Sequence, residues 1–231
     1  MFPSRLVSAL GKGALENNYS LDFDGSDDYV VIADDASLDD VGDLSIAAWF
    51  KTSTTANEIL IDKGYTDSYR IYGGRNDGNS PLILVAGGNI RAASDYSDGL
   101  WHFMTVVYSD AGDYLKLYMD AVLDNENTSY TQSLSANSNN LQIGKAVSGS
   151  AYQYEGLTDE VAIWNKALSA GDIAALYEAR GTSDLNDDGS SGNLVGWWRF
   201  EEGSGTSAID SSANSNTGTL TNGPAYSRDT P

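Results

Sequence analysis

The sequence predicts an all-β protein, an antiparallel sandwich that carries one short helix. The first observation is a period of two in the apolar pattern, as in Leu44–Lys51, where Leu44, Ile46 and Phe50 point to one side. The second is a series of turn-forming clusters, such as 110–113, at spacings of roughly 8–12 residues. Together these patterns indicate many short strands joined by tight turns.

Taken in chain order, the predicted strands are short and bounded by Gly, Asn, Asp and Ser. They lie at 44–51, 59–61, 69–72, 82–85, 101–108, 114–118 and 194–200. Helical spacing occurs near 169–180, where Ser169 is a good N-cap and Asp172 stands three residues later. The chain therefore contains one predicted α-helix, which ends before Gly181.

Composition excludes several classes of function. The 231 residues suit one large domain, and the absence of cysteine removes disulfides and thiolate sites. With 13 basic and 33 acidic residues the net charge is -20, so we expect no nucleic-acid partner and no anionic membrane partner. No apolar stretch approaches the roughly 18 residues of a membrane span, and we recognise no signal peptide.

Several segments together resemble the LamG-like jelly roll of the concanavalin A-like lectin and glucanase superfamily. These are SLDFDGSDDYVVI (20–32), DLSIAAWFK (43–51), ILIDKG (59–64), YRIY (69–72), GLWHFMTVVYS (99–109), LKLYMDAVLD (115–124), NLQIGK (140–145) and GLTDEVAIWNKALSAGDIAALYEAR (156–180). The resemblance covers about residues 19–221. It implies an antiparallel jelly-roll β-sandwich with a lectin-like surface.

One motif stands in an unusual place. The run LVGWWRFEEGSGTSAIDSSANSNTGTL (194–220) opens many domains of this type but closes this chain. The domain is circularly permuted, or the run begins a truncated second copy. We favour permutation, because the first and last strands of such sandwiches are neighbours. The predicted organisation is an N-terminal arm (1–18), a single domain (19–224) that 194–221 complete, and a tail (225–231).

Catalytic signatures are weak. Related glucanases place acids in an E-x-D-x-E run on one strand, and the nearest match here is Glu155 with Asp159 and Glu160, where adjacent acids point to opposite faces. His102 is the only histidine and falls in a predicted core strand. We therefore expect no enzyme, with a glycoside hydrolase as a remote alternative.

Calcium is the one cofactor that the sequence suggests, in a structural role. The run 184–189 reproduces the D-x-[DN]-x-[DN]-G start of a calcium loop, but Val195 stands where its bidentate Glu should be, and a plain turn explains the same residues. The resemblance implies a second site between Asp24 and Asp159, with Asp27 and Asp28 beside them as ligands or as a polar turn. The candidate metal ligands are Asp24, Asp159, Asp184, Asn186 and Asp188.

Sugar binding needs an aromatic platform with polar side chains at its edge, because pyranose faces are apolar and their edges form hydrogen bonds. The candidate residues lie in predicted loops. They are Tyr65, Arg75, Asn76, Asp77, Tyr96 and Tyr152.

The first residues form a mildly basic arm on an acidic protein, or simply a frayed terminus. Its candidate attachment residues are Phe2, Arg5, Leu6, Leu10 and Lys12. Stand-alone chains with this resemblance are similar to bacteriophage virion proteins, which implies a structural or adhesive role as a capsid decoration or fibre on a virion surface, or a role outside the cell. Its partners would be other surface-assembly proteins and cell-surface glycans, and self-association stays open. The alternative is a free calcium-dependent lectin.

Overall fold

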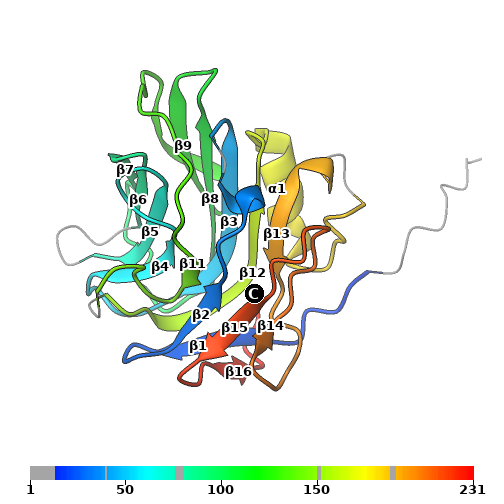
Figure 1. The fold of residues 1–231 in the computed structure, drawn as a ribbon. Coiled ribbons are helices and arrows are strands. Elements are labelled where there is room, and N and C mark those ends of the chain that lie inside the picture. Colours follow the sequence, from blue (N-terminus) through cyan, green and yellow to red (C-terminus); the bar gives the residue numbers. More distant parts are fainter. Residues whose placement is uncertain (1–13, 40, 76–80, 150–151, 188–190) are drawn as a thin grey trace, which may run out of the picture.

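The computed structural model describes residues 14–39, 41–75, 81–149, 152–187 and 191–231. Over these residues the chain forms two antiparallel sheets that pack face to face, which confirms the predicted β-sandwich (Figure 1). The first sheet, sheet A, contains β1 (Ser20–Asp24), β3 (Leu44–Lys51), β8 (His102–Ser109), β9 (Tyr114–Met119), β10 (Val122–Asn127), β12 (Glu155–Trp164), β13 (Leu194–Trp198) and β16 (Ala225–Ser227). No helix in the described residues is long and apolar enough to cross a membrane.

The second sheet, sheet B, faces sheet A across the core. It contains β2 (Tyr29–Ile32), β4 (Glu58–Asp62), β5 (Tyr69–Gly74), β6 (Leu82–Val85), β7 (Gly88–Arg91), β11 (Leu141–Ile143), β14 (Ser207–Ala208) and β15 (Gly218–Thr221). The strand orders are β10-β9-β8-β3-β12-β1-β16, with β13 also paired to β12, and β14-β15-β2-β11-β4-β5-β6-β7. Two short 3-10 turns, η1 (Ala36–Leu38) and η2 (Ser191–Asn193), complete the elements.

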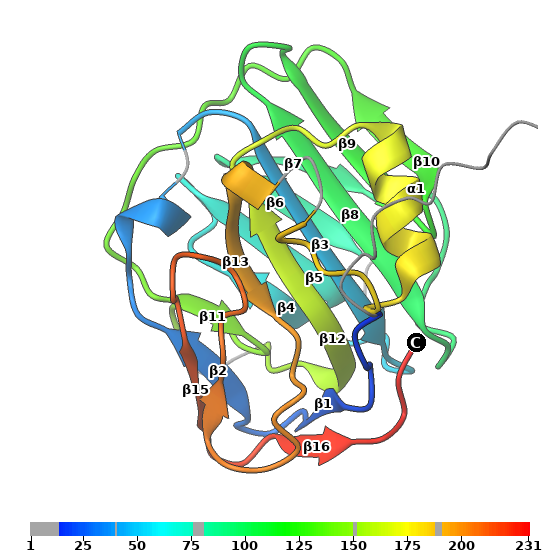
Figure 2. The same cartoon turned by 90° about the vertical axis from the view of Figure 1, so that its right-hand side faces the viewer.

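The period of two in the strands divides the apolar residues between two cores. Residues such as Ile46, Ile71 and Leu117 fill the space between the sheets. α1 (Ala170–Ala179) lies over part of the other side of sheet A (Figure 2). Its Ile173 belongs to the same apolar cluster as Trp49. This is the helix predicted near 169–180. It begins in a capping box, since Ser169 and Asp172 each accept a hydrogen bond from the other's backbone N–H.

The C-terminal segment contributes to both sheets of the same sandwich. β13 pairs with β12 in sheet A, and β15 pairs with β2 in sheet B. The predicted tail is also part of the fold, because β16 pairs with β1 and Asp229 accepts hydrogen bonds from Lys51 and Trp101. The tail at 225–231 therefore adds an edge strand that the sequence does not predict, because three residues are too few to show an alternating pattern.

The last part of the predicted arm also packs on the domain. The backbone N–H of Leu15 donates to the Thr182 carbonyl at 2.8 Å, and Arg199 donates to the Glu16 carbonyl at 2.6 Å. Glu201 accepts from the backbone N–H groups of Asn18 and Tyr19. Residues 14–18 are thus held by the domain. The attachment candidates Phe2, Arg5, Leu6, Leu10 and Lys12 lie outside the described residues.

Candidate functional site

The outer face of sheet B carries a buried row of polar and aromatic side chains. Arg70 and Tyr72 are two residues apart on β5 and so point to the same side. Asp62 on β4 accepts a hydrogen bond from Arg70 at 2.7 Å, which fixes the guanidinium. The Tyr65 ring lies over that guanidinium, with 4.8 Å between its centroid and the Arg70 Cζ.

A second exposed tyrosine packs on the same row. The Tyr152 ring meets the Tyr72 ring edge to face, with centroids 6.2 Å apart, and the Arg75 Cζ lies 5.1 Å from the Tyr72 centroid. Tyr152 is held at this face, because its carbonyl accepts from the backbone N–H of Ile59 at 3.0 Å. Val147 likewise donates its backbone N–H to Asp62 at 2.7 Å. We call Tyr65, Arg70, Tyr72, Arg75 and Tyr152 the tyrosine platform.

The platform presents aromatic surface to solvent. Tyr65 is 48% exposed and Tyr152 is 43% exposed, and both are among the exposed large apolar side chains of the described residues. The structure therefore brings together three of the predicted sugar-binding residues, Tyr65, Arg75 and Tyr152. Asn76 and Asp77 lie outside the described residues. Sequence reasoning missed Arg70 and Tyr72, which the period of two along 69–72 could have placed on one face.

Tyr96 lies elsewhere. Its hydroxyl donates to Asp124 at 3.0 Å, and its ring meets the His102 ring at 4.9 Å between centroids. Tyr96 therefore takes part in a different network, at the start of β8, and is not part of the tyrosine platform.

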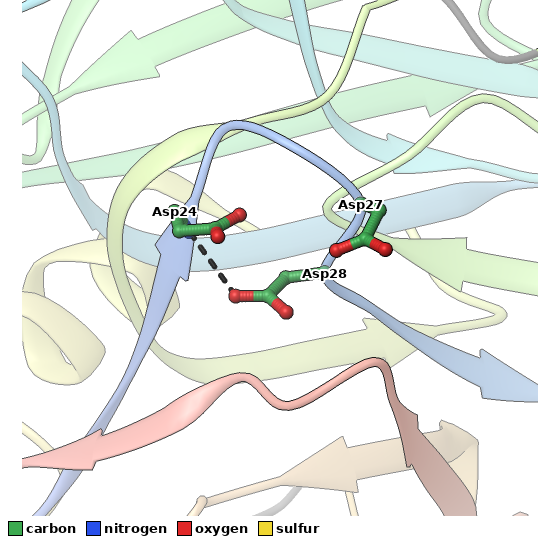
Figure 3. A group of neighbouring side chains, drawn as sticks. All are labelled: Asp24, Asp27 and Asp28. Atoms are coloured by element: carbon green, nitrogen blue, oxygen red, sulfur yellow. Dashed lines mark hydrogen bonds between the residues drawn. The ribbon is translucent and has the colours of Figure 1, made fainter.

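Three aspartates meet in the turn between β1 and β2. Asp24, Asp27 and Asp28 each place a carboxylate oxygen within 4.8 Å of the others (Figure 3). Asp28 is buried and accepts from the backbone N–H of Asp24 at 3.2 Å, while Asp24 accepts from that of Ser26 at 2.8 Å. Burial raises the pKa of Asp28, and the nearby carboxylates add to that rise. The turn's own hydrogen bonds explain why these side chains gather.

The implied pairing of Asp24 with Asp159 is wrong. The register of β1 and β12 sets Asp24 opposite Glu155. Asp159 is four residues further along β12, roughly 13 Å away at the rise of a strand. One ion cannot take ligands from both side chains, and the sequence could not show this because register depends on the partner strand.

Asp159 has its own unusual environment. It is fully buried between β3 and the N-terminal segment, and its Oδ1 accepts from the backbone N–H of Glu160 at 2.9 Å. Within the described residues its Oδ2 has no hydrogen-bond partner, and neither has the buried Oδ1 of Asn17, whose side chain lies beside it. Burial raises the pKa of Asp159 well above its ordinary range, and the Glu160 carboxylate adds to this. A proton on Asp159, which the raised pKa favours, lets its O–H donate to the Asn17 Oδ1 beside it. Without that proton the same two oxygens would suit a hard cation such as Ca²⁺.

Glu160 is held away from any substrate. It accepts from the Trp197 indole at 2.6 Å and from Arg199 at 3.2 Å, and burial raises its pKa to about 8 although Arg199 opposes that rise. Glu155, the third acid of the predicted hydrolase set, is exposed at the other end of the segment. These acids do not form the open pair that a glycosidase requires.

The predicted calcium loop near 184–189 forms a hydrogen-bonded turn where it is described. Asp184 Oδ1 accepts from the backbone N–H and the side-chain amide of Asn186, at 3.1 and 3.0 Å. The same amide donates to the Ser211 carbonyl at 2.9 Å. These bonds favour the plain turn, and Asp188 lies outside the described residues.

The fold and its surface define a lectin-type jelly roll with an aromatic platform on one sheet and buried acids on the other. Residues 24–174 match the family described as the concanavalin A-like lectin/glucanases superfamily. The chain belongs to this family.

Two curated relatives share its sequence at a low level. They are the sushi, von Willebrand factor type A, EGF and pentraxin domain-containing protein 1 of Rattus norvegicus and that of Mus musculus, each 23% identical over 223 residues. Each match covers 85% of this chain and 6% of the relative, so the chain spans about 6% of the length of these proteins.

Solved structures share the fold at low identity. A protein of Bacteroides ovatus ATCC 8483, described as a candidate carbohydrate-binding protein, is 15% identical with a TM-score of 0.72, over 93% of this chain and 60% of that one. The heptameric SAP-like pentraxin of Limulus polyphemus is 14% identical with a TM-score of 0.57, over 71% and 84%. The ligand-binding domain of botulinum neurotoxin serotype D, in complex with N-acetylneuraminic acid, is 17% identical with a TM-score of 0.55, over 73% and 43%. These likenesses confirm the jelly-roll fold.

Proposed function

We propose that the chain is a non-catalytic recognition module that binds glycans through the tyrosine platform and so serves adhesion at a surface. One observation carries this proposal: Tyr65 and Tyr152 are about half exposed, and their rings pack on Arg70 and Tyr72, which are neighbours on one side of β5. The fold is a lectin-like jelly roll, and two proteins of similar fold are described with carbohydrate ligands or roles.

The chemistry of the platform suits a sugar. A tyrosine face stacks on the apolar face of a pyranose, while hydroxyl and guanidinium groups reach its polar edge. Arg70 is buried and fixed by the Asp62 carboxylate, and its guanidinium holds the exposed Tyr65 ring in place before any ligand arrives, which lowers the entropy that binding would cost.

Substitution of both tyrosines tests the proposal. A glycan array would be probed with the wild type and with the Tyr65→Ala, Tyr152→Ala double variant, in calcium and in chelator. Two lost stacking contacts of about 0.5–1.5 kcal/mol each predict roughly 5- to 150-fold weaker binding.

The matched control is Tyr114→Ala. This variant removes a tyrosine on sheet A whose ring centroid lies 4.6 Å from the Lys116 Nζ. This variant should bind as the wild type does. The proposal would be rejected if the double variant binds as strongly as the wild type, or if the wild type binds no glycan on the array.

Calcium is proposed as a structural ion at Asp159 and Asn17, where it would neutralise a buried carboxylate and tie the N-terminal segment to β12. Calcium should then raise the melting temperature of the wild type and of Asp27→Asn, and should leave that of Asp159→Asn unchanged. A rise that persists in Asp159→Asn and vanishes in Asp27→Asn would move the ion to the turn between β1 and β2.

A structural role in a virion or another surface assembly remains the second proposal, with an extracellular or virion-surface location. The charge contrast supports it, since Arg5 and Lys12 are basic residues near the N-terminus of a chain with a net charge of -20. Deletion of residues 1–13 should abolish assembly without changing glycan binding, and retained assembly would reject attachment through this segment.

A further inference from the structure

His102 stands between two carboxylates at the start of β8. Its Nδ1 lies 2.8 Å from Asp120 Oδ2, and its Nε2 lies 3.1 Å from Asp98 Oδ1. The ring packs between Phe50 and Tyr96, with centroid distances of 6.2 and 4.9 Å. It is the only histidine in the chain, so no other imidazole shares its titration.

The two contacts fix the number of protons on the ring. A neutral imidazole has one donor and one acceptor, whereas a carboxylate only accepts. Only the imidazolium can therefore donate to both Asp98 and Asp120. When the ring loses a proton, one carboxylate oxygen faces a nitrogen lone pair at hydrogen-bond distance, and that contact becomes repulsive.

The contact with Asp98 is the one that yields. Asp120 is held in the turn after β9, where its Oδ1 also accepts from the backbone N–H of Phe103 at 2.9 Å. Asp98 lies in the loop between β7 and β8, with a side chain 47% exposed to solvent. Its Oδ1 also accepts from the backbone N–H of Leu100 at 2.9 Å, so a movement of Asp98 disturbs the turn that contains it.

We propose that His102 is a proton-operated clasp, which holds the turn of Asp98 to Leu100 when protonated and releases it when neutral. The turn also forms one wall of a cleft of about 410 Å³, whose lining includes Gly99 and the acidic residues Asp22 and Glu155. Release of the clasp therefore loosens this wall, while the hydrogen bond from Gly99 to the Thr52 carbonyl, 2.9 Å long, keeps the loop tethered.

The charged groups around the ring favour the clasped state. The hydrogen bond with Asp120 raises the pKa of His102 above its ordinary value of 6.5; burial opposes this rise, and Asp98 adds to it. Tyr96 is hydrogen-bonded to Asp124, and burial raises the pKa of that phenol, so it stays neutral. The clasp therefore opens as the pH rises through the raised pKa of His102 and closes as the pH falls below it.

NMR titration of this single imidazole, with amide hydrogen exchange, tests the clasp between pH 5 and 9. The His102 pKa should exceed 6.5 in the wild type and fall in Asp98→Asn, because the new side-chain amide can donate to a neutral Nε2. The protection factor of the Leu100 amide should drop about two- to five-fold as the wild type passes that pKa, the range expected for an exposed ion pair. It should stay constant in Asp98→Asn.

Two further measurements keep the result clear. The Gly87 amide, which donates to the Tyr65 carbonyl in another loop, should keep a constant protection factor. His102→Gln should make the protection factor of the Leu100 amide independent of pH, because the variant has no titrating ring. A His102 pKa at or below 6.5 that Asp98→Asn leaves unchanged, or a Leu100 protection factor as constant as that of Gly87, would overturn the proposal.

Discussion

Glu58 should make the sandwich less stable as the pH rises. Its side chain is buried at the start of β4, where Oε2 accepts from the backbone N–H of Glu155 at 3.2 Å. Burial raises the pKa of Glu58 from 4.5 to about 7; the hydrogen bonds from Glu155 and Thr54 oppose that rise, and the Glu155 charge adds to it. The folded state thus holds a proton that the unfolded chain has already released.

The size of the effect follows from the two pKa values. Between 4.5 and about 7 the folded state binds more protons, so the free energy of unfolding falls as the pH rises through this window. A pKa difference of one between the folded and unfolded states is worth about 1.4 kcal/mol. Relative to low pH, Glu58 therefore lowers the free energy of unfolding by about 1 kcal/mol at pH 5 and by about 3 kcal/mol at pH 8.5. Glu58→Gln keeps an oxygen that accepts from the Glu155 N–H, and it removes the charge. The free energy of unfolding of this variant, relative to that of the wild type, should therefore rise by about 2 kcal/mol between these two pH values.

Urea unfolding at pH 5 and pH 8.5, with chelator throughout, measures this difference. Glu178→Gln on the exposed side of α1 is the control, and its difference from the wild type should not depend on pH. If Glu58→Gln and the wild type differ by the same amount at both pH values, the carboxylate is not buried as described.

A glycine substitution and a pair of deletions test how the domain is closed. Gly156→Ala should cost more than about 2 kcal/mol in urea unfolding, because φ is +144° and a Cβ would stand 2.2 Å from the Lys51 carbonyl oxygen, whereas Gly192→Ala meets nothing within 4 Å and should be neutral. Deletion of residues 1–13 should leave the melting temperature nearly unchanged, and deletion of 1–18 should lower it by several degrees, because Arg199 and Glu201 lose partners. Equal melting temperatures would mean that residues 14–18 add no stability.

The sequence predicts those parts of the fold that local pattern determines. The period of two locates strands such as Leu44–Lys51, and the capping residues locate α1 within one residue of its ends. Register is different, because it depends on which residue of another strand lies opposite. The family resemblance implies a shared site for Asp24 and Asp159, but local pattern cannot show that Glu155 is the residue facing Asp24.

Burial separates the aromatic residues that could bind a ligand from those that build the core. On the outer face of sheet A, Trp49 is already stacked by Tyr177, with ring centroids 5.4 Å apart, beneath α1. On sheet B no helix among the described residues takes that position, and Tyr65 and Tyr152 remain about half exposed. The same kind of side chain thus stabilises one sheet and stays available on the other. A glycan site on this chain should therefore respond to changes on sheet B and ignore those beneath α1.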